Sequence, residues 1–97
     1  MAKKGYWVVS YKSVPTPGIF AEYAKIAVAA LEKLGGRAIV VGNPAKTHEA
    51  GVDQMVVIVE FENLQQAIAA YESEQYKPAL AMISSAAERD FRILEGQ

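Results

Sequence analysis

The segment from Gln54 to Phe61 constrains the fold more than any other part of the chain. A strand with one solvated face alternates apolar and polar residues. Here Val57 and Val59 fall on one side and Val56 and Ile58 on the other, so both sides are apolar. A single domain of 97 residues has helices enough for one face of a sheet only. We therefore predict that a second copy of the chain covers the other face.

The remaining patterns predict one domain over residues 1–97, with a flexible N-terminus at residues 1–4. Short β-branched and aromatic runs predict strands, at Tyr6–Lys12, Arg37–Gly42, Gln54–Phe61 and Asp90–Glu95. An apolar stripe at helical spacing predicts a helix from Pro17, with Thr16 as its cap, to about Leu34. A second helical region follows a capping pair, Asn63 and Gln66, and breaks around Ser73–Pro78.

The predicted order is β-α-β-β-α-β, which is the ferredoxin-like α+β fold. With right-handed crossovers, the antiparallel sheet carries both helices on one face. Two such sheets packed through their helix-free faces would form a dimeric α/β barrel.

Composition excludes several classes of partner and chemistry. The 10 basic and 11 acidic residues are scattered, which argues against nucleic acid and against electrostatic docking on a membrane. The chain has no cysteine, so it has no disulfide, thiol nucleophile or Cys-based metal site. No segment has the length and hydropathy of a membrane span or a signal peptide. We expect a cytoplasmic protein.

Two residues are candidates for acid–base catalysis. His48 is the only histidine and stands beside Glu49 in a polar loop, where the pair could exchange protons. The alternative is an isolated surface histidine. Glu60 shares a strand face with Val56 and Ile58, and a carboxylate on an apolar face is a candidate general base. The alternative is a partly solvated carboxylate at a strand end, bound to a backbone N–H or an arginine. No spaced cluster of carboxylates points to a metal site.

A second group of candidates could bind a ligand. Tyrosine and tryptophan combine an apolar body with a polar tip, which suits a small apolar or phenolic molecule. The aromatic candidates are Trp7, Tyr11, Tyr23, Tyr71 and Tyr76. The alternative for them is ordinary core packing. Arg37, at the start of a predicted strand, could bind a ligand carboxylate or pair with a neighbouring acid such as Glu60.

One ordered set of residues spans nearly the whole chain: Gly5-Tyr6-Trp7, Tyr23, Gly35-Gly36-Arg37, Glu60-Phe61, Tyr71, Ser73, Tyr76 and Glu95-Gly96. This set resembles the bacterial domain-of-unknown-function family 1330. The resemblance implies the dimeric α/β-barrel fold and, because the family has no established activity, it implies no particular reaction.

Together these observations predict a homodimeric small-molecule-binding protein with a pocket between sheet and helices in each subunit. It would bind a small, partly apolar metabolite, and a cofactor-free enzyme is one form of this prediction, since related dimeric barrels include such enzymes. The alternative is a non-catalytic ligand-binding or dimerisation module, for which Glu60→Gln and His48→Ala would be silent. A haem enzyme with His48 as ligand is a third interpretation, suggested by the superfamily; we expect no cofactor because the chain is too small to enclose a haem.

Overall fold

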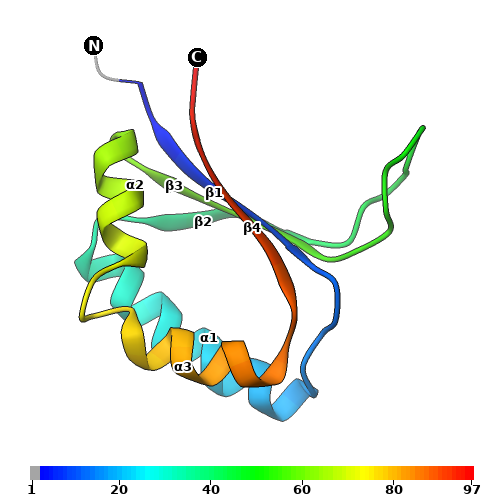
Figure 1. Cartoon of the computed structure of the whole chain (residues 1–97), viewed down its shortest axis with the longest axis horizontal. Coiled ribbons are helices and arrows are strands. Elements are labelled where there is room, and N and C mark those ends of the chain that lie inside the picture. Colours follow the sequence, from blue (N-terminus) through cyan, green and yellow to red (C-terminus); the bar gives the residue numbers. More distant parts are fainter. Residues whose placement is uncertain (1–2) are drawn as a thin grey trace.

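The computed structural model describes residues 3–97 and contains one four-stranded sheet with three helices on one of its faces (Figure 1). The elements are β1 (Gly5–Tyr11), α1 (Pro17–Lys33), β2 (Arg37–Gly42), β3 (Val56–Phe61), α2 (Leu64–Tyr71), α3 (Lys77–Ala86) and β4 (Arg89–Glu95). The predicted ferredoxin-like α+β order is confirmed, and the second helical region is divided into α2 and α3 as expected.

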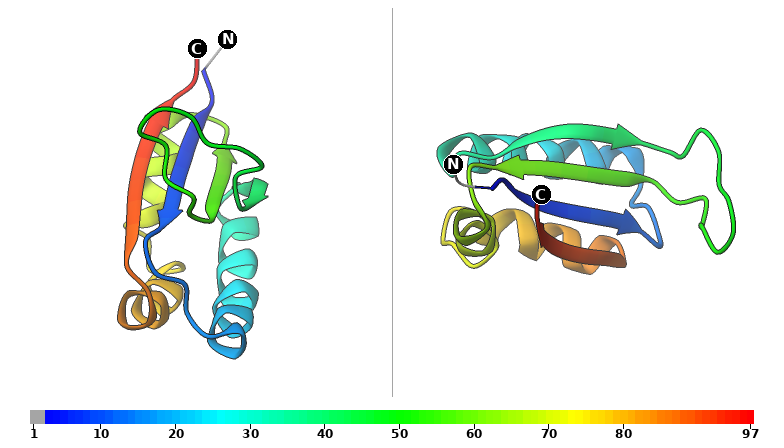
Figure 2. Two further views of the ribbon diagram at one scale, coloured as in Figure 1. Left: turned by 90° about the vertical axis from the view of Figure 1, so that its right-hand side faces the viewer. Right: turned by 90° about the horizontal axis from the view of Figure 1, so that it is seen from above.

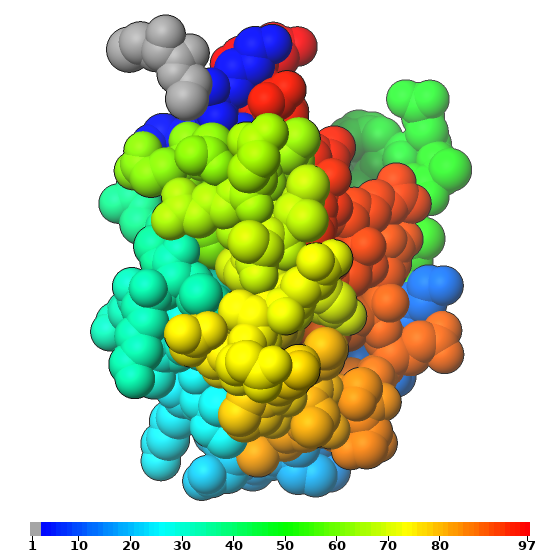
Figure 3. Space-filling view, turned by 60° about the vertical axis from the view of Figure 1, so that its left-hand side comes forward, coloured from blue at the N-terminus to red at the C-terminus, as the bar shows by residue number. Residues whose placement is uncertain are grey.

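The sheet has the strand order β2-β3-β1-β4, and all neighbouring strands are antiparallel. Because β1 and β2 both pair with β3, they run parallel to each other with β3 between them, which is a split β-α-β unit. All helices pack on the same side, as the two rotated views show (Figure 2). The helices form a continuous layer in the space-filling view, where α3 lies against α1 (Figure 3).

Strand alternation places the larger apolar side chains under the helices. In β1 the buried residues are Trp7, Val9 and Tyr11. Val59 and Val57 are the β3 partners of Trp7 and Val9 and point to the same side. Trp7 is the centre of the core: its ring centroid lies 5.0 Å from those of Phe61, Tyr76 and Phe91.

The opposite face of the sheet has no helix, and we call it the helix-free face (Figure 1). Three rows of side chains cross it. The central row is Val40, Ile58, Val8 and Arg92, and the flanking rows are Arg37, Glu60, Tyr6, Leu94 and Gly42, Val56, Ser10, Asp90. The predicted apolar second face is therefore present, and Ile58 stands near its middle.

Helix α1 ends at a glycine pair. Gly35 adopts a positive φ of 78°, a conformation that glycine tolerates without steric cost. Gly36 is buried against the ring of Phe61, so that a Cβ at this position would overlap the ring. At the other end of α1, Thr16 occupies the N-cap position as predicted, but its side chain makes no capping hydrogen bond.

The start of α2 differs in one detail from the predicted capping pair. Asn63 Oδ1 accepts a hydrogen bond of 2.8 Å from the backbone N–H of Gln66, as expected. The Gln66 side chain does not return to Asn63; it donates to the carbonyl of Leu34 at 3.0 Å. Gln66 therefore links the end of α1 to the start of α2.

Several boundaries differ from the sequence-based ones. β3 begins at Val56 instead of Gln54, and β1 ends at Tyr11 instead of Lys12. β4 begins one residue earlier than predicted, at Arg89. Of the expected flexible N-terminus, residues 1–2 lie outside the described residues. Lys4 accepts a backbone hydrogen bond from Gly96 at 2.8 Å.

Within residues 3–97, none of the helices is both long enough and apolar enough to cross a lipid bilayer.

We expect Gly36→Ala to lower the free energy of unfolding by about 1–3 kcal/mol, because the added methyl group must displace the buried Phe61 ring. Gly18→Ala is the matched control, since Gly18 lies in α1 with open space around it. It should raise the free energy of unfolding by about 0.5–1 kcal/mol. Urea unfolding at one fixed protein concentration measures both. Equal effects of the two substitutions would contradict the packing at Gly36.

Candidate functional site

A cavity of about 140 Å³ lies between α1 and the helix-covered face of the sheet. A dry engineered cavity of about 150 Å³ is large enough to bind benzene, so this one matches a single six-membered ring. Its buried walls are Trp7, Val9, Tyr11, Tyr23, Ala27, Leu31, Val59 and Tyr76. The walls are almost entirely apolar.

The mouth of the pocket lies between α1 and the edge strand β2. The exposed residues that line it are Val28 on α1 and Ala38 and Val41 on β2. Val28 is 51% and Val41 is 60% exposed, although both belong to the pocket lining. Helix α1 thus leaves the outer strand largely uncovered, and this gap connects the cavity with solvent.

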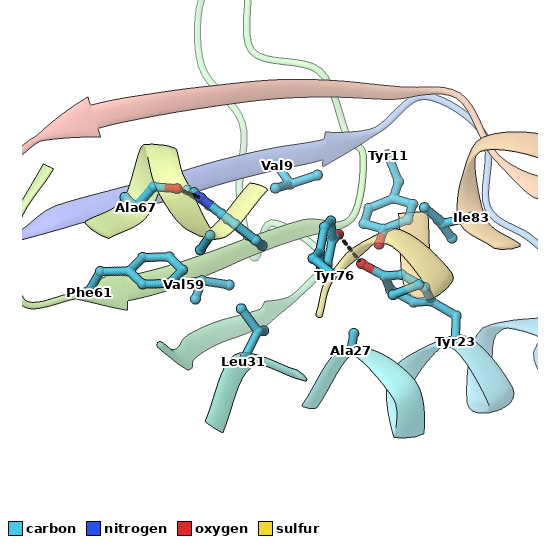
Figure 4. Close-up of a cluster of buried hydrophobic side chains, with 13 residues drawn as sticks. Val9, Tyr11, Tyr23, Ala27, Leu31, Val59, Phe61, Ala67, Tyr76 and Ile83 are labelled. Carbon is cyan, nitrogen blue, oxygen red and sulfur yellow. Dashed lines mark hydrogen bonds between the residues drawn. The ribbon is translucent and has the colours of Figure 1, made fainter. Parts of the chain in front are cut away.

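The inner end of the pocket is polar. The hydroxyls of Tyr23 and Tyr76 form a buried hydrogen bond of 2.8 Å with each other. Arg89 donates from one of its terminal nitrogens to the Tyr23 hydroxyl at 3.3 Å. The hydroxyl of Tyr11 points toward the same pair (Figure 4). Three hydroxyls and a guanidinium therefore lie close together at one end of an otherwise apolar cavity.

The break between α2 and α3 positions Tyr76. The Ser73 hydroxyl donates to the carbonyl of Ala70 at 2.7 Å and accepts from the backbone N–H of Tyr76 at 3.2 Å. Pro78 then fixes the first turn of α3. These contacts end α2, turn the chain, and leave the completely buried Tyr76 side chain directed at Tyr23.

The first residue of β4 supplies Arg89, which lies opposite Tyr11 in the sheet. Its guanidinium carbon is 5.1 Å from the centroid of the Phe91 ring and 5.8 Å from those of Tyr11 and Tyr23. Such cation–π contacts are favourable for arginine at partly desolvated positions. The preceding residue, Glu88, is anchored by its carbonyl, which accepts from Lys12 N–H at 2.8 Å.

The environment raises the pKa of two of the tyrosine hydroxyls, those of Tyr11 and Tyr23. Burial raises the pKa of Tyr23 well above its ordinary value, and the neighbouring Tyr76 raises it further. Burial also raises the pKa of Tyr11, partly offset by the positive charge of Arg89. For Arg89, burial lowers the pKa, but the tyrosines raise it by more, so that it lies above its ordinary value. The polar end therefore combines neutral hydroxyls with a permanent positive charge.

Of the predicted ligand-binding residues, the structure brings four to the pocket, and they are Trp7, Tyr11, Tyr23 and Tyr76. Trp7 offers only its ring, because its indole N–H donates to the carbonyl of Ala67 at 2.8 Å. Tyr71 is not in the lining; its ring packs against Phe91 with centroids 4.8 Å apart, on the filled side of the core. The predicted space between Tyr23, Tyr71 and the sheet is thus hollow only on the Tyr23 side.

Arg37 and the two candidate catalytic residues lie elsewhere. Glu60 is on the helix-free face, where Tyr6 donates to it at 3.2 Å and Arg37 at 3.5 Å. Arg37 therefore pairs with Glu60, as the second of its two sequence-based interpretations predicts. His48 is exposed in the loop between β2 and β3, which projects away from the helices (Figure 1). Neither His48 nor Glu60 lines the pocket.

Sequence reasoning missed Arg89, because the last strand was expected to begin at Asp90. One signal could have found it. Phe91 and Ile93 alternate onto one face of the last strand, and extending that alternation by two residues places Arg89 on the same face. Only the fold, however, brings Arg89 next to Tyr23, which is 66 residues away in the chain.

Comparison with known proteins supports the fold. SnoaB, a cofactor-independent oxygenase from Streptomyces nogalater, superposes with a TM-score of 0.71 at 10% identity, over 99% of this chain and 95% of SnoaB. A protein of unknown function from Rhodopseudomonas palustris gives 0.69 at 14% identity, over 100% of this chain and 85% of that one. A dimeric ferredoxin-like protein of unknown function from Thermobifida fusca gives 0.61 at 16% identity, over 98% and 92%.

At the level of sequence, residues 4–97 match the family model described as a domain of unknown function, DUF1330. No curated protein is significantly similar to the chain. The similarities to the solved structures lie at 10–16% identity, so they establish the fold alone. Any chemical activity has to be argued from the residues of this chain.

The buried Tyr23 hydroxyl predicts a loss of stability at alkaline pH. Its folded pKa is raised above the value of about 10 for an unfolded tyrosine. The stabilisation is therefore complete below about pH 10 and is lost as the pH rises further, because the unfolded chain then releases a proton that the folded chain retains. Tyr23→Phe should show a shallower loss of unfolding free energy between about pH 9.5 and 11.5. Lysines titrate equally in both proteins, so parallel curves would contradict the burial of this hydroxyl.

Proposed function

The chain belongs to the DUF1330 family, and we propose that it is a homodimeric small-molecule-binding protein with one ligand pocket in each subunit. The observation that carries the proposal is the cavity of about 140 Å³, which is apolar along its length and polar at its inner end. A concave apolar site with a few convergent polar groups is the usual form of a small-molecule site.

The proposed dimer pairs the helix-free faces of two sheets. Six side chains make this face apolar, and they are Tyr6, Val8, Val40, Val56, Ile58 and Leu94. An uncovered apolar patch of this extent on a monomer is a typical association surface. The similar protein from Thermobifida fusca is described as dimeric, which agrees with this proposal.

The charged residues of the helix-free face also suit burial against a second copy. Arg92 binds Asp90 through two hydrogen bonds of 3.0 and 3.2 Å, and Arg37 pairs with Glu60. A charge that is already paired costs less to remove from water than an isolated one. The face therefore presents apolar side chains with its charges matched inside the subunit.

The proposed ligand is a small, partly apolar metabolite. The walls fit one ring-sized apolar body, and the hydroxyls of Tyr23 and Tyr76 with Arg89 provide donors for one polar group. Donors of this kind also stabilise negative charge that develops on a bound molecule. A cofactor-free enzyme is therefore one form of the proposal, and the description of SnoaB as a cofactor-independent oxygenase is consistent with it.

The alternative is a carrier that binds the same class of ligand without chemistry. One observation favours it: none of the residues that line the pocket is an aspartate, glutamate or histidine. Proton transfer in the pocket would thus fall to tyrosine hydroxyls, and burial raises the pKa of the Tyr23 hydroxyl well above its ordinary value. Recovery of an unchanged ligand after prolonged incubation would favour the carrier, and its conversion would favour the enzyme.

The dimer predicts that Ile58→Glu produces monomers of reduced stability, because it places a charge near the middle of the helix-free face. An obligate interface of this kind buries about 2,000 Å² or more in total. Ile68→Glu is the matched control, since Ile68 is 41% exposed on α2, on the other side of the sheet. Sedimentation velocity at micromolar concentration should show dimers for the wild type and Ile68→Glu only. A well-folded wild-type monomer would rule out the proposed assembly.

The pocket predicts that Ala27→Leu abolishes ligand binding, because Ala27 is a buried wall residue and the added atoms fill the cavity. Ala29→Leu, at an exposed position of the same helix, is its control and should bind normally. Phenol, benzamide and benzoate are suitable probes, and isothermal calorimetry measures their binding. If none of the three binds the wild type, or if both variants bind equally, the pocket is not the site.

A further inference from the structure

The arginines of this chain differ in how their charges are compensated. Arg37 and Arg92 have exposed side chains, at 77% and 71%, and each pairs with a carboxylate. Arg89 is half-buried, yet within residues 3–97 it forms no ion pair. A buried charge is costly unless an opposite charge or several hydrogen bonds compensate it. Arg89 is therefore the most buried of the three arginines and the one without a carboxylate partner in the described residues.

The contacts of Arg89 leave its hydrogen-bonding edge largely available. A guanidinium has five N–H donors, and one of them bonds the Tyr23 hydroxyl at 3.3 Å, with the hydroxyls of Tyr11 and Tyr76 close by. The three aromatic rings around it, Tyr11, Tyr23 and Phe91, provide cation–π contacts that do not occupy the N–H groups. No buried side-chain nitrogen or oxygen in the described residues lacks a partner, so the remaining N–H groups reach the pocket or solvent.

The tyrosine pair supplies one further donor. Tyr23 and Tyr76 share one hydrogen bond, which uses one of their two hydroxyl hydrogens. If Tyr76 donates to Tyr23, the Tyr23 hydrogen is free, and in the opposite case the Tyr76 hydrogen is free. In both arrangements one hydroxyl hydrogen remains beside the guanidinium, where it can bond the nearby Tyr11 hydroxyl or a ligand oxygen.

We propose that the ligand carries a carboxylate, which Arg89 binds together with the free hydroxyl hydrogen of the Tyr23–Tyr76 pair while a ring-sized apolar body fills the cavity. This inference rests on the proposed pocket and names its ligand class, small cyclic carboxylic acids. The planar guanidinium matches the two oxygens of a carboxylate, and such charge-assisted bonds are about twice as strong as neutral ones. A single arginine in an apolar cavity compensates one negative charge, which favours a carboxylate over a doubly charged phosphate.

A second copy of the chain does not supply the missing anion in the proposed dimer. Arg89 lies on the helix-covered side of the sheet, opposite Tyr11, whereas the partner packs on the helix-free face. The sheet itself separates the two. A counter-charge would therefore have to come from a ligand on the helix-covered side, where Arg89 lines the pocket.

Benzoate and benzamide test the inference, because they have the same ring and nearly the same shape but differ in charge. We expect calorimetry on the wild-type protein at pH 7 to show benzoate binding at least about tenfold more tightly than benzamide, the ratio that corresponds to 1.4 kcal/mol. Arg89→Gln should remove the preference, because it should weaken benzoate binding by much more than benzamide binding. Arg92→Gln removes an arginine from the opposite face of the same strand and should keep the preference.

A measurement on the wild-type protein makes the test independent of how well Arg89→Gln folds. Benzoate should shift the NMR resonance of the Arg89 Nε–H group, assigned by its absence in Arg89→Lys, and benzamide should not. Equal affinities for the two probes, or a preference that survives Arg89→Gln, would overturn the carboxylate inference while leaving the pocket intact. Failure of both probes and of phenol to bind would remove the pocket and this inference together.

Discussion

A sheet that is apolar on both faces must be covered twice, and this requirement governs the rest of the structure. The chain supplies one cover, in which α1, α2 and α3 pack over Trp7, Phe61 and Tyr76. The second face, with Ile58 near its middle, carries no helix. Since apolar surface in contact with water is unfavourable in proportion to its area, the simplest completion is a second copy of the same face.

The small number of helices also leaves space for the pocket. Three helices cover four strands incompletely, and the outer strand β2 is exposed over most of its length. Small residues on α1, such as Ala27, keep the helix from filling the space beneath it. What remains is a ring-sized cavity whose inner end holds Tyr23, Tyr76 and Arg89. The proposed dimer interface and the proposed ligand pocket thus lie on opposite sides of one sheet, so that each proposal can be tested without the other.

The fold could be predicted from the sequence because its signals are local. The alternation from Val56 to Glu60 and the apolar stripe containing Tyr23 each report on a single element, and both were interpreted correctly. The glycine pair and the break near Ser73 fixed where helices end. Small errors at the boundaries arose because strand ends have no capping signal comparable to that of a helix.

The site was harder to predict because it depends on distances between elements. The sequence made Tyr23 and Tyr76 candidates for a ligand pocket, but their contact depends on the packing of α1 against α3. Tyr71 lies on the apolar stripe of α2, as Tyr23 does on α1, yet Tyr71 packs against Phe91 instead of lining the pocket. No sequence pattern distinguishes the position of Tyr71 from that of Tyr23. Arg89 was missed since its partner rings come from three different parts of the chain.

Pairing of the helix-free faces of two copies of the chain can be tested directly by isotope-filtered NMR on a mixture of labelled and unlabelled protein. We expect intermolecular contacts between the methyl groups of Val8, Val40 and Ile58 in one copy and apolar side chains of the other. A stable folded protein whose methyl groups on this face show contacts only with water and with their own subunit would contradict it.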